Sequence, residues 1–274
     1  MDFSIKEQFE GFLATPQIYA EDHILDYPLY HAFHLASPEE LPEISAPGAT
    51  ILGKRMEHFF ASYIDQFTSE MILAHNRQII QDQKTLGELD FLLKNNISGG
   101  ISHVELVYKF YIYDEATGSS ESDHLIGPNK RDSLGRKIDR LKKRQFPLLY
   151  HEATRNLLDE LEVAPNDVVQ KMCFKASVFL PKRMDRISLE IINPATISGY
   201  WIKTSEFTLE AYQKNKFFIP AKNYWPVKPQ RNSTWLTRQE IEPQLHQLLA
   251  KKFSPLVWMK TPSGKHERFF VVWW

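Results

Sequence analysis

The sequence predicts a mixed α/β (α+β) fold, in which one helix precedes three strands and a second helix precedes a further strand. Two observations lead to this prediction. Apolar residues recur at three- and four-residue spacing after residue 51, as in a helix, and the runs 87–94 and 101–112 alternate apolar and polar residues, as strands do. A shorter strand-like run, 77–82, precedes them, and an apolar run at 170–180 follows the second helix. This order of elements is typical of an α/β or α+β core.

The chain of 274 residues is 43% hydrophobic, which suffices for one large or two small domains. Residues 1–50 hold a short helical segment and an aromatic, proline-punctuated stretch, which we interpret as an N-terminal arm packed on the body. Residues 51–185 form the predicted core. Residues 186–274 form a predicted β-rich C-terminal subdomain.

The helix that opens the core is predicted from one apolar stripe. Its members are Leu52, Met56, Phe59, Phe60, Tyr63, Ile64 and Phe67. Glu57 lies beside this stripe, either partly buried where the helix meets the sheet or as an ordinary boundary carboxylate. The second helix is expected over 126–160, with a kink or a break at Pro147, which cannot donate a backbone hydrogen bond.

The C-terminal part shows strand signals at 187–192 and 200–203, a helical stripe over 237–252, and a hairpin that joins 256–260 to 269–274. Between them lies the aromatic run 217–226. It suggests core packing or a surface for a protein or nucleic-acid partner, and it identifies no chemistry.

Several classes of protein and site are disfavoured by the sequence. No apolar run approaches the roughly 18 residues of a membrane span, and the first residues lack the pattern of a signal peptide, so we expect a cytoplasmic protein without membrane contact. The lone Cys173 excludes an internal disulfide and is expected to be a buried thiol. His23, His31 and His34 have irregular spacing, which argues against a zinc site.

The two central strands bring acidic and basic residues to one face. In the run 101–112 the even positions from Val104 to Ile112 are almost wholly apolar, whereas the odd positions include His103, Glu105 and Lys109. The neighbouring run places Glu88 and Asp90 together, and a short turn joins the two strands. This arrangement would suit a divalent-metal phosphodiesterase site. The alternative is a cross-strand ion network with Lys94, Lys109 and His103 on a solvated face.

The net charge of −1 gives no overall sign of nucleic-acid binding, but the basic residues are unevenly distributed. Residues 130–144 contain eight basic and two acidic side chains, a local charge of +6. Such a stripe either neutralises nucleic-acid phosphates or is a solvated helix face. The residues predicted to bind nucleic acid are Lys130, Arg131, Arg136, Lys137 and Arg140.

Four segments resemble a known bacterial family over most of the chain. They are 53–57 (GKRME), 86–92 (LGELDFL), 103–111 (HVELVYKFY) and 127–129 (GPN), and they are similar to the domain-of-unknown-function family 1853. The order of elements and the acidic positions also resemble the PD-(D/E)XK nuclease superfamily. That resemblance implies a restriction-endonuclease-like core of helix, three-strand meander, helix and strand, with catalytic roles for Glu57, Asp90, Glu105 and Lys109.

One position departs from the pattern of the nuclease superfamily. The lysine expected two residues after the third-strand acid is replaced by Val107, and Lys109 lies about 13 Å along the strand from Glu105, at roughly 3.3 Å per residue. Lys94 or Lys137 would be a substitute, because this lysine migrates within the superfamily. A degenerate, non-catalytic nuclease fold is the alternative.

The sequence therefore leads to the hypothesis of a nuclease or nuclease-like enzyme that depends on magnesium or manganese and acts on DNA. Asp90 and Glu105 would hold the ion, since magnesium binds hard oxygen ligands and needs one or two carboxylates beside the substrate phosphate. Without the ion, Glu88, Asp90 and Glu105 would repel one another and hold protons more tightly. The second hypothesis is a non-enzymatic module that binds nucleic acid or protein.

Overall fold

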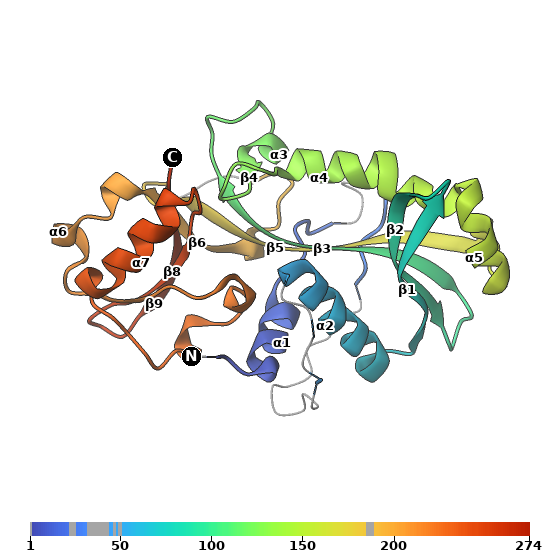
Figure 1. The fold of residues 1–274 in the computed structure, drawn as a ribbon, viewed down its shortest axis with the longest axis horizontal. Coiled ribbons are helices and arrows are strands. Elements are labelled where there is room, and N and C mark those ends of the chain that lie inside the picture. Colours follow the sequence, from blue (N-terminus) through green and yellow to red (C-terminus); the bar gives the residue numbers. More distant parts are fainter. Residues whose placement is uncertain (1, 22–25, 32–43, 46–47, 49–50, 185–188) are drawn as a thin grey trace.

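A long mixed β-sheet runs through the molecule, with helices packed on both of its faces (Figure 1). The computed structural model describes residues 2–21, 26–31, 44–45, 48, 51–184 and 189–274. The strands follow the order β1-β2-β3-β5-β6-β9-β8-β7, and β4 pairs with β3. The predicted α/β class is confirmed.

The strands are β1 (Glu70–Gln81), β2 (Lys84–Asn95), β3 (Ile101–Tyr113), β4 (Leu125–Ile126), β5 (Val168–Pro181), β6 (Ile197–Lys203), β7 (Lys216–Phe218), β8 (Leu256–Lys260) and β9 (His266–Val272). The α-helices are α1 (Ile5–Ala14), α2 (Leu52–Phe67), α3 (Glu121–His124), α4 (Leu134–Arg140), α5 (Arg155–Glu160), α6 (Leu209–Tyr212) and α7 (Arg238–Ala250). Among the described residues, no helix is both long and apolar enough to cross a membrane.

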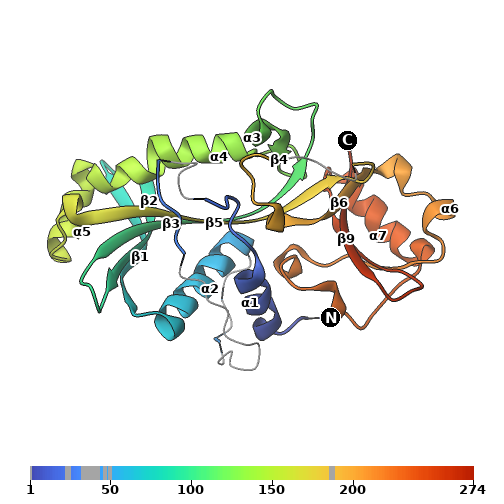
Figure 2. The ribbon, with the colours of Figure 1, turned by 180° about the vertical axis from the view of Figure 1, so that it is seen from behind.

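The three-strand meander is found where the sequence places it, as antiparallel β1, β2 and β3, although β1 begins at Glu70 rather than near residue 77. The following strand, β5, lies parallel to β3 along twelve residues of each strand. A parallel neighbour requires a long crossover, and the segment from β4 through α4 and α5 supplies it across one face of the sheet (Figure 2).

Helices α1 and α2 cover the opposite face. The predicted stripe of α2 is buried against the even-numbered residues of β3, including Val104 and Tyr108, because those side chains point to the same side of the strand. The odd-numbered Val107 and Tyr111 pack on the other face, beneath the crossover. Cys173 is fully buried, as expected, and burial raises the pKa of its thiol to about 12.

Of the kink or break predicted at Pro147, the structure shows a break, which begins earlier, at Leu141. α4 passes directly into a π-helical turn, Leu141–Gln145, which is followed by a 3₁₀ turn, Phe146–Tyr150, that contains Pro147. A π turn inserts one extra residue into the helical repeat and so rotates the side chains that follow it. Pro147 is tolerated because it lies in the first turn of the new helix, where its missing N–H is not needed.

The predicted strand at 187–192 is not formed by its described residues, 189–192. Ile192 makes only an isolated bridge to Tyr19. The carboxylate of Glu121 accepts hydrogen bonds from the backbone N–H groups of Glu190 and Ile192, at 2.8 and 3.0 Å, so these donors are not available to a strand.

The N-terminal arm covers part of the edge of β5. The backbone N–H of Ile18 donates to Phe174, and that of Tyr30 donates to Met172, at 2.7 and 2.9 Å. β6 pairs with β5 only from Val178 onward. The arm therefore completes hydrogen bonding along the part of β5 that β6 does not reach. The strands from β6 to β9 then continue the same sheet.

Candidate functional site

The candidate site lies where β2 and β3 separate. Their backbone pairing runs from Lys94–Ile101 to Phe91–Val104 and ends there. At the next position the backbone N–H of Leu106 donates to the side chain of Asp90, at 2.9 Å, instead of to the backbone of β2. A carboxylate thus takes the place of a ladder hydrogen bond, and a fork opens between the two strands.

Three carboxylates converge at this fork, within the described part of the chain. One ligand oxygen from each of Glu57, Glu88 and Asp90 lies within 4.8 Å of the others. Glu57 comes from α2, whereas Glu88 and Asp90 are two residues apart on β2 and so point to the same side of the strand. The ammonium of Lys54 contacts Glu57 and Glu88, at 2.8 and 2.5 Å.

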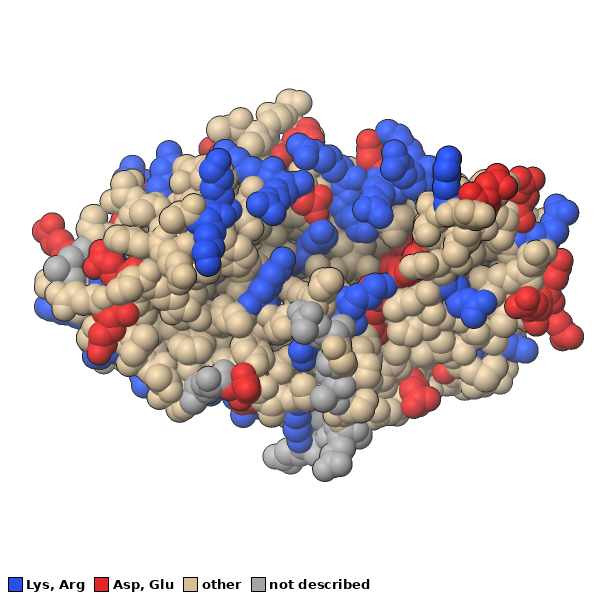
Figure 3. Space-filling model, in the orientation of Figure 1, with Lys and Arg blue, Asp and Glu red and all other residues tan. Residues whose placement is uncertain are grey.

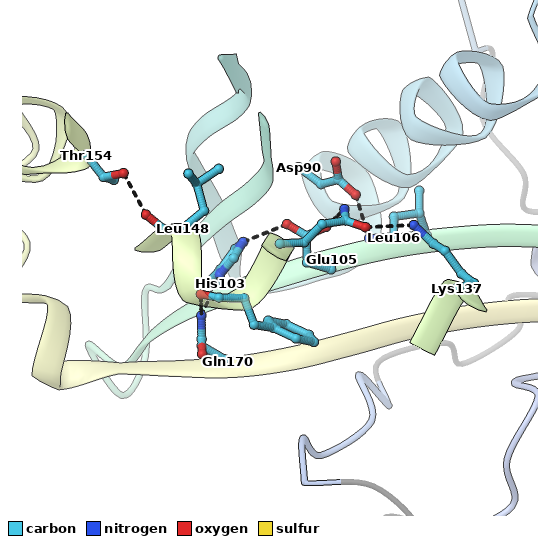
Figure 4. Close-up of polar contacts among 10 residues, drawn as sticks. Asp90, His103, Glu105, Leu106, Lys137, Leu148, Thr154 and Gln170 are labelled. Atoms are coloured by element: carbon cyan, nitrogen blue, oxygen red, sulfur yellow. Dashed lines mark hydrogen bonds and ion pairs between the residues drawn. The ribbon is translucent and has the colours of Figure 1, made fainter. Parts of the chain in front are cut away.

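Glu105 is next to this cluster and is fully buried. It interacts with the side chain of Asp90, and Figure 4 shows Asp90, Glu105 and Lys137 in one region above β3. Burial raises the pKa of Glu105 to about 8, and burial together with the charge of Glu105 raises the pKa of Asp90 well above its usual range. The two acids therefore hold a proton more readily than exposed carboxyls do.

A chain of side-chain hydrogen bonds fixes the position of Glu105 (Figure 4). His103 Nε2 lies 2.9 Å from Glu105 Oε1, and the amide of Gln145 donates to Glu105 Oε2. The carbonyl oxygen of that amide accepts from Lys137 Nζ, at 2.8 Å. Gln145 is the last residue of the π turn, so this turn brings an amide between a lysine and a carboxylate.

The tautomer of His103 follows from its second partner. Gln170 Nε2 lies 3.0 Å from His103 Nδ1 and also donates to the carbonyl oxygen of Phe146, at 2.7 Å. Because an amide nitrogen only donates, Nδ1 must accept, and Nε2 carries the hydrogen that is donated to Glu105. Burial lowers the pKa of His103 to about 4, which agrees with a neutral ring.

The predicted site residues are thus only partly together. Asp90 and Glu105 are adjacent, and Glu57 faces Asp90 from α2. Lys109 instead makes an ion pair with Asp132, at 2.5 Å. Lys137, named from the sequence as a possible substitute, is the lysine whose charge acts on both acids, and burial lowers its own pKa.

The solvated-face alternative is contradicted, since His103 and Glu105 are both 0% exposed. Three residues of the site were not predicted from the sequence: Lys54, Gln145 and Gln170. Lys54 was recognisable in principle, because it precedes Glu57 by one helical turn. The two glutamines carried no signal, since their positions depend on the π turn and on the pairing of β5 with β3.

Four of the five predicted nucleic-acid-binding residues are exposed: Lys130, Arg131, Arg136 and Arg140. The fifth, Lys137, is directed to the acidic cluster. Figure 3 shows basic side chains gathered along the edge formed by α4 and its flanking segments, and acidic side chains in the middle of the same face. A basic surface therefore borders the site.

The chain matches a family described as a domain of unknown function, DUF1853, over residues 32–272. The match includes every residue of the acidic cluster and of the hydrogen-bonded chain around Glu105. No curated protein and no solved structure gave a significant match. Because the matched range covers most of the sequence, the chain belongs to the DUF1853 family.

Proposed function

We propose that this protein is a metal-dependent nuclease, with a core of the restriction-endonuclease type, that hydrolyses phosphodiester bonds in DNA. The observation that carries the proposal is the convergence of Glu57, Glu88 and Asp90 at the fork, with Glu105 and Lys137 beside them. The order α2, β1–β3, crossover and parallel β5 is the order of elements that the nuclease resemblance implies.

The donor set fits magnesium or manganese, because it consists of carboxylate oxygens that lie close enough together to share one ion. Asp90, Glu88 and Glu57 would hold the ion, with Glu105 in contact with Asp90. A bound divalent ion supplies an activated water and positive charge at the phosphate. Lys54 now neutralises Glu57 and Glu88; its side chain is 42% exposed and is free to turn toward solvent when an ion binds.

The surrounding residues have separate roles in the proposal. Lys137 offers an ammonium for the negative charge that develops on the phosphate. Gln145 holds Lys137 and Glu105 apart by one amide, which keeps the lysine from a direct ion pair that would neutralise it. His103 donates to Glu105 without adding charge, because its ring is neutral. The basic surface along α4 binds the backbone without reading bases.

A second function, a non-catalytic binding module with the same fold, is favoured by one observation. Lys54 already satisfies two of the three clustered carboxylates, so the cluster is partly neutralised without an ion. In that case the basic surface would bind nucleic acid and no bond would be cut.

The decisive experiment incubates the purified protein with single-stranded, duplex and branched DNA, with and without manganese. We expect manganese-dependent cleavage, lowered at least 10²-fold in Asp90→Asn and in Glu88→Gln. The matched control is Asp82→Asn, an exposed acid in the β1–β2 turn whose φ of 49° asparagine also tolerates. Tight DNA binding without cleavage or manganese binding would reject the enzyme and support the binding module.

A further inference from the structure

A cleft of about 470 Å³ begins next to the acidic cluster. It lies between the first residues of α2, the middle of β3, the loop 127–132 and the segment 222–225. Leu106 and Lys137 belong to its lining, and both also contact residues of the candidate site. The cleft and the acidic cluster are therefore neighbours along one surface.

The charged side chains in this lining are mostly basic. They are Lys109, Arg131, Lys137 and Lys222, with Asp132 as the acid. Asp132 is neutralised by its ion pair with Lys109. In the described part of the chain no carboxylate lies within 4.0 Å of the charged groups of Arg131 or Lys222. Partial burial and the charge of Lys109 lower the pKa of Lys222, so these cations repel one another across the cleft.

The end of a long helix adds to the positive potential. Leu52 and Gly53 line the cleft at the N-terminus of the 16-residue α2. The residue at the N-cap, Ile51, supplies no side-chain acceptor, and the first turn contains no acidic residue. Free N–H groups and the helix dipole at such an end favour a negatively charged ligand.

Two buried donors in the same lining also lack an acceptor. Tyr111 Oη and Trp225 Nε1 have no hydrogen-bond partner among the described residues. Trp225 is only 3% exposed and Tyr111 is fully buried. These two donors lie near the cleft, but the anion is called for by the cations of its lining and by the helix N-terminus.

We infer that this cleft binds a phosphate of the nucleic-acid strand next to the phosphate that lies at the acidic cluster. The inference rests on the proposed function only for the phosphate at the acidic cluster; the phosphate in the cleft does not depend on it. A strand is favoured over a free phosphate ester because Lys137 is shared: it lines the cleft and also acts on Asp90 and Glu105. One chain of phosphates would then pass from the cleft to the cluster, and the volume suits about one nucleotide.

The test measures binding of a short labelled single strand, in EDTA and across a range of salt concentrations. We expect the double variant Arg131→Gln/Lys222→Gln to bind at least 10-fold more weakly. The slope of log affinity against log salt should fall by about 0.7, the value for one neutralised phosphate on a single strand. The matched control removes two exposed lysines away from the cleft, Lys214→Gln/Lys260→Gln, and should keep both quantities near the wild-type values.

Further arms separate this inference from the proposed enzyme. Asp90→Asn should lose cleavage in manganese yet bind the strand in EDTA at least as tightly as the wild type, because the cleft is intact. An unchanged affinity and salt slope in the cleft variant would overturn the inference even if the protein cleaves DNA. If the protein binds thymidine monophosphate as tightly as the strand, the cleft is a site for a free phosphate ester, and the inference of a strand-binding cleft is overturned. Circular dichroism of each variant checks that it is folded.

Discussion

The carboxylate of Asp90 on β2 accepts a hydrogen bond from the backbone N–H of Leu106 on β3, at 2.9 Å. This hydrogen bond follows the last backbone pair of the two strands, Phe91–Val104, and holds the carboxylate of Asp90 in the fork between them. The side chain is only 8% exposed, and Glu57 and Glu105 act on it with like charge. The fold therefore places acids together at an energetic cost, as functional sites often do.

Removing one of these acids should stabilise the metal-free protein. The substitution Asp90→Asn keeps a side-chain oxygen for the Leu106 N–H but removes the charge. We expect the free energy of unfolding in EDTA to rise by about 1 kcal/mol at pH 7, measured by urea denaturation. In the wild type the pKa of Asp90 is higher in the folded state than in the unfolded state, so the protein loses stability as the pH rises from the unfolded pKa toward the folded one. The stability gained by Asp90→Asn should therefore grow with pH. A clear loss of stability, with Asp82→Asn unchanged, would contradict this view.

The amide of Gln145 should contribute to stability through both of its hydrogen bonds. Gln145→Leu leaves Lys137 and Glu105 without that partner, and we expect a loss of about 1–3 kcal/mol in urea denaturation. The control Gln244→Leu makes the same substitution at an exposed position of α7 and should change stability little. Equal effects of the two substitutions would show that the bridge is not important.

The neutral state of His103 predicts a pH dependence with a definite sign. The pKa of His103 in the folded protein, about 4, lies below the ordinary 6.5. The stability that the neutral ring contributes is therefore fully present above pH 6.5 and is lost as the pH falls toward 4. His103→Gln keeps a donor for Glu105 and an acceptor for Gln170 but does not titrate. Relative to this variant, the wild type should lose about 3 kcal/mol between pH 6.5 and 4. A constant difference across this range would show that His103 is not held neutral.

The identity of the lysine at the site can be tested by the rate of cleavage. Under the proposed function, Lys137→Met should lower the single-turnover rate at saturating DNA about 10²-fold or more. Lys109→Met should act mainly on the affinity for DNA, because Lys109 pairs with Asp132 in the cleft rather than with the acids. The reverse ranking of the two rates would return the catalytic role to Lys109.

A close contact between α1 and the C-terminal part predicts a large effect of one methyl group. A Cβ at Gly11 would lie 2.3 Å from the carbonyl oxygen of Pro226. Alanine normally favours a helix, yet we expect Gly11→Ala to destabilise the protein by about 1–3 kcal/mol, because backbone must move. Gly48→Ala, where a Cβ meets nothing within 4 Å, serves as the control in the same denaturation experiment. Wild-type stability in Gly11→Ala would mean that α1 does not pack as described.

The parts of the fold with a clear period were predictable from the sequence. The stripe of α2 and the alternation of β3 determine which side chains meet in the core, and the alternation of β2 puts Glu88 and Asp90 on one side of that strand. Residues 187–192 show how such a pattern misleads. Their alternating apolar residues satisfied the strand pattern, but Glu121 binds the backbone N–H groups of Glu190 and Ile192.

The assembly of the site was less predictable, because it depends on contacts between distant segments. The meeting of Glu57 with Glu88 requires α2 to dock at the fork, and nothing local to either residue encodes that distance. The place of Gln145 requires the π turn, for which the sequence has no known signature. Lys137 was foreseeable only as one of several lysines.

The arm that runs along β5 also has a consequence for handling the protein. Pro16 and Pro28 donate no backbone hydrogen bond, yet their carbonyl oxygens accept from Ala176 and Met172. Removing residues 1–31 would leave the backbone N–H groups of Met172 and Ala176, on the buried strand β5, exposed to water. Another polypeptide strand could then pair with them. Shortened versions that lack the arm are therefore expected to aggregate through this strand, and the arm belongs in any fragment made for crystallisation.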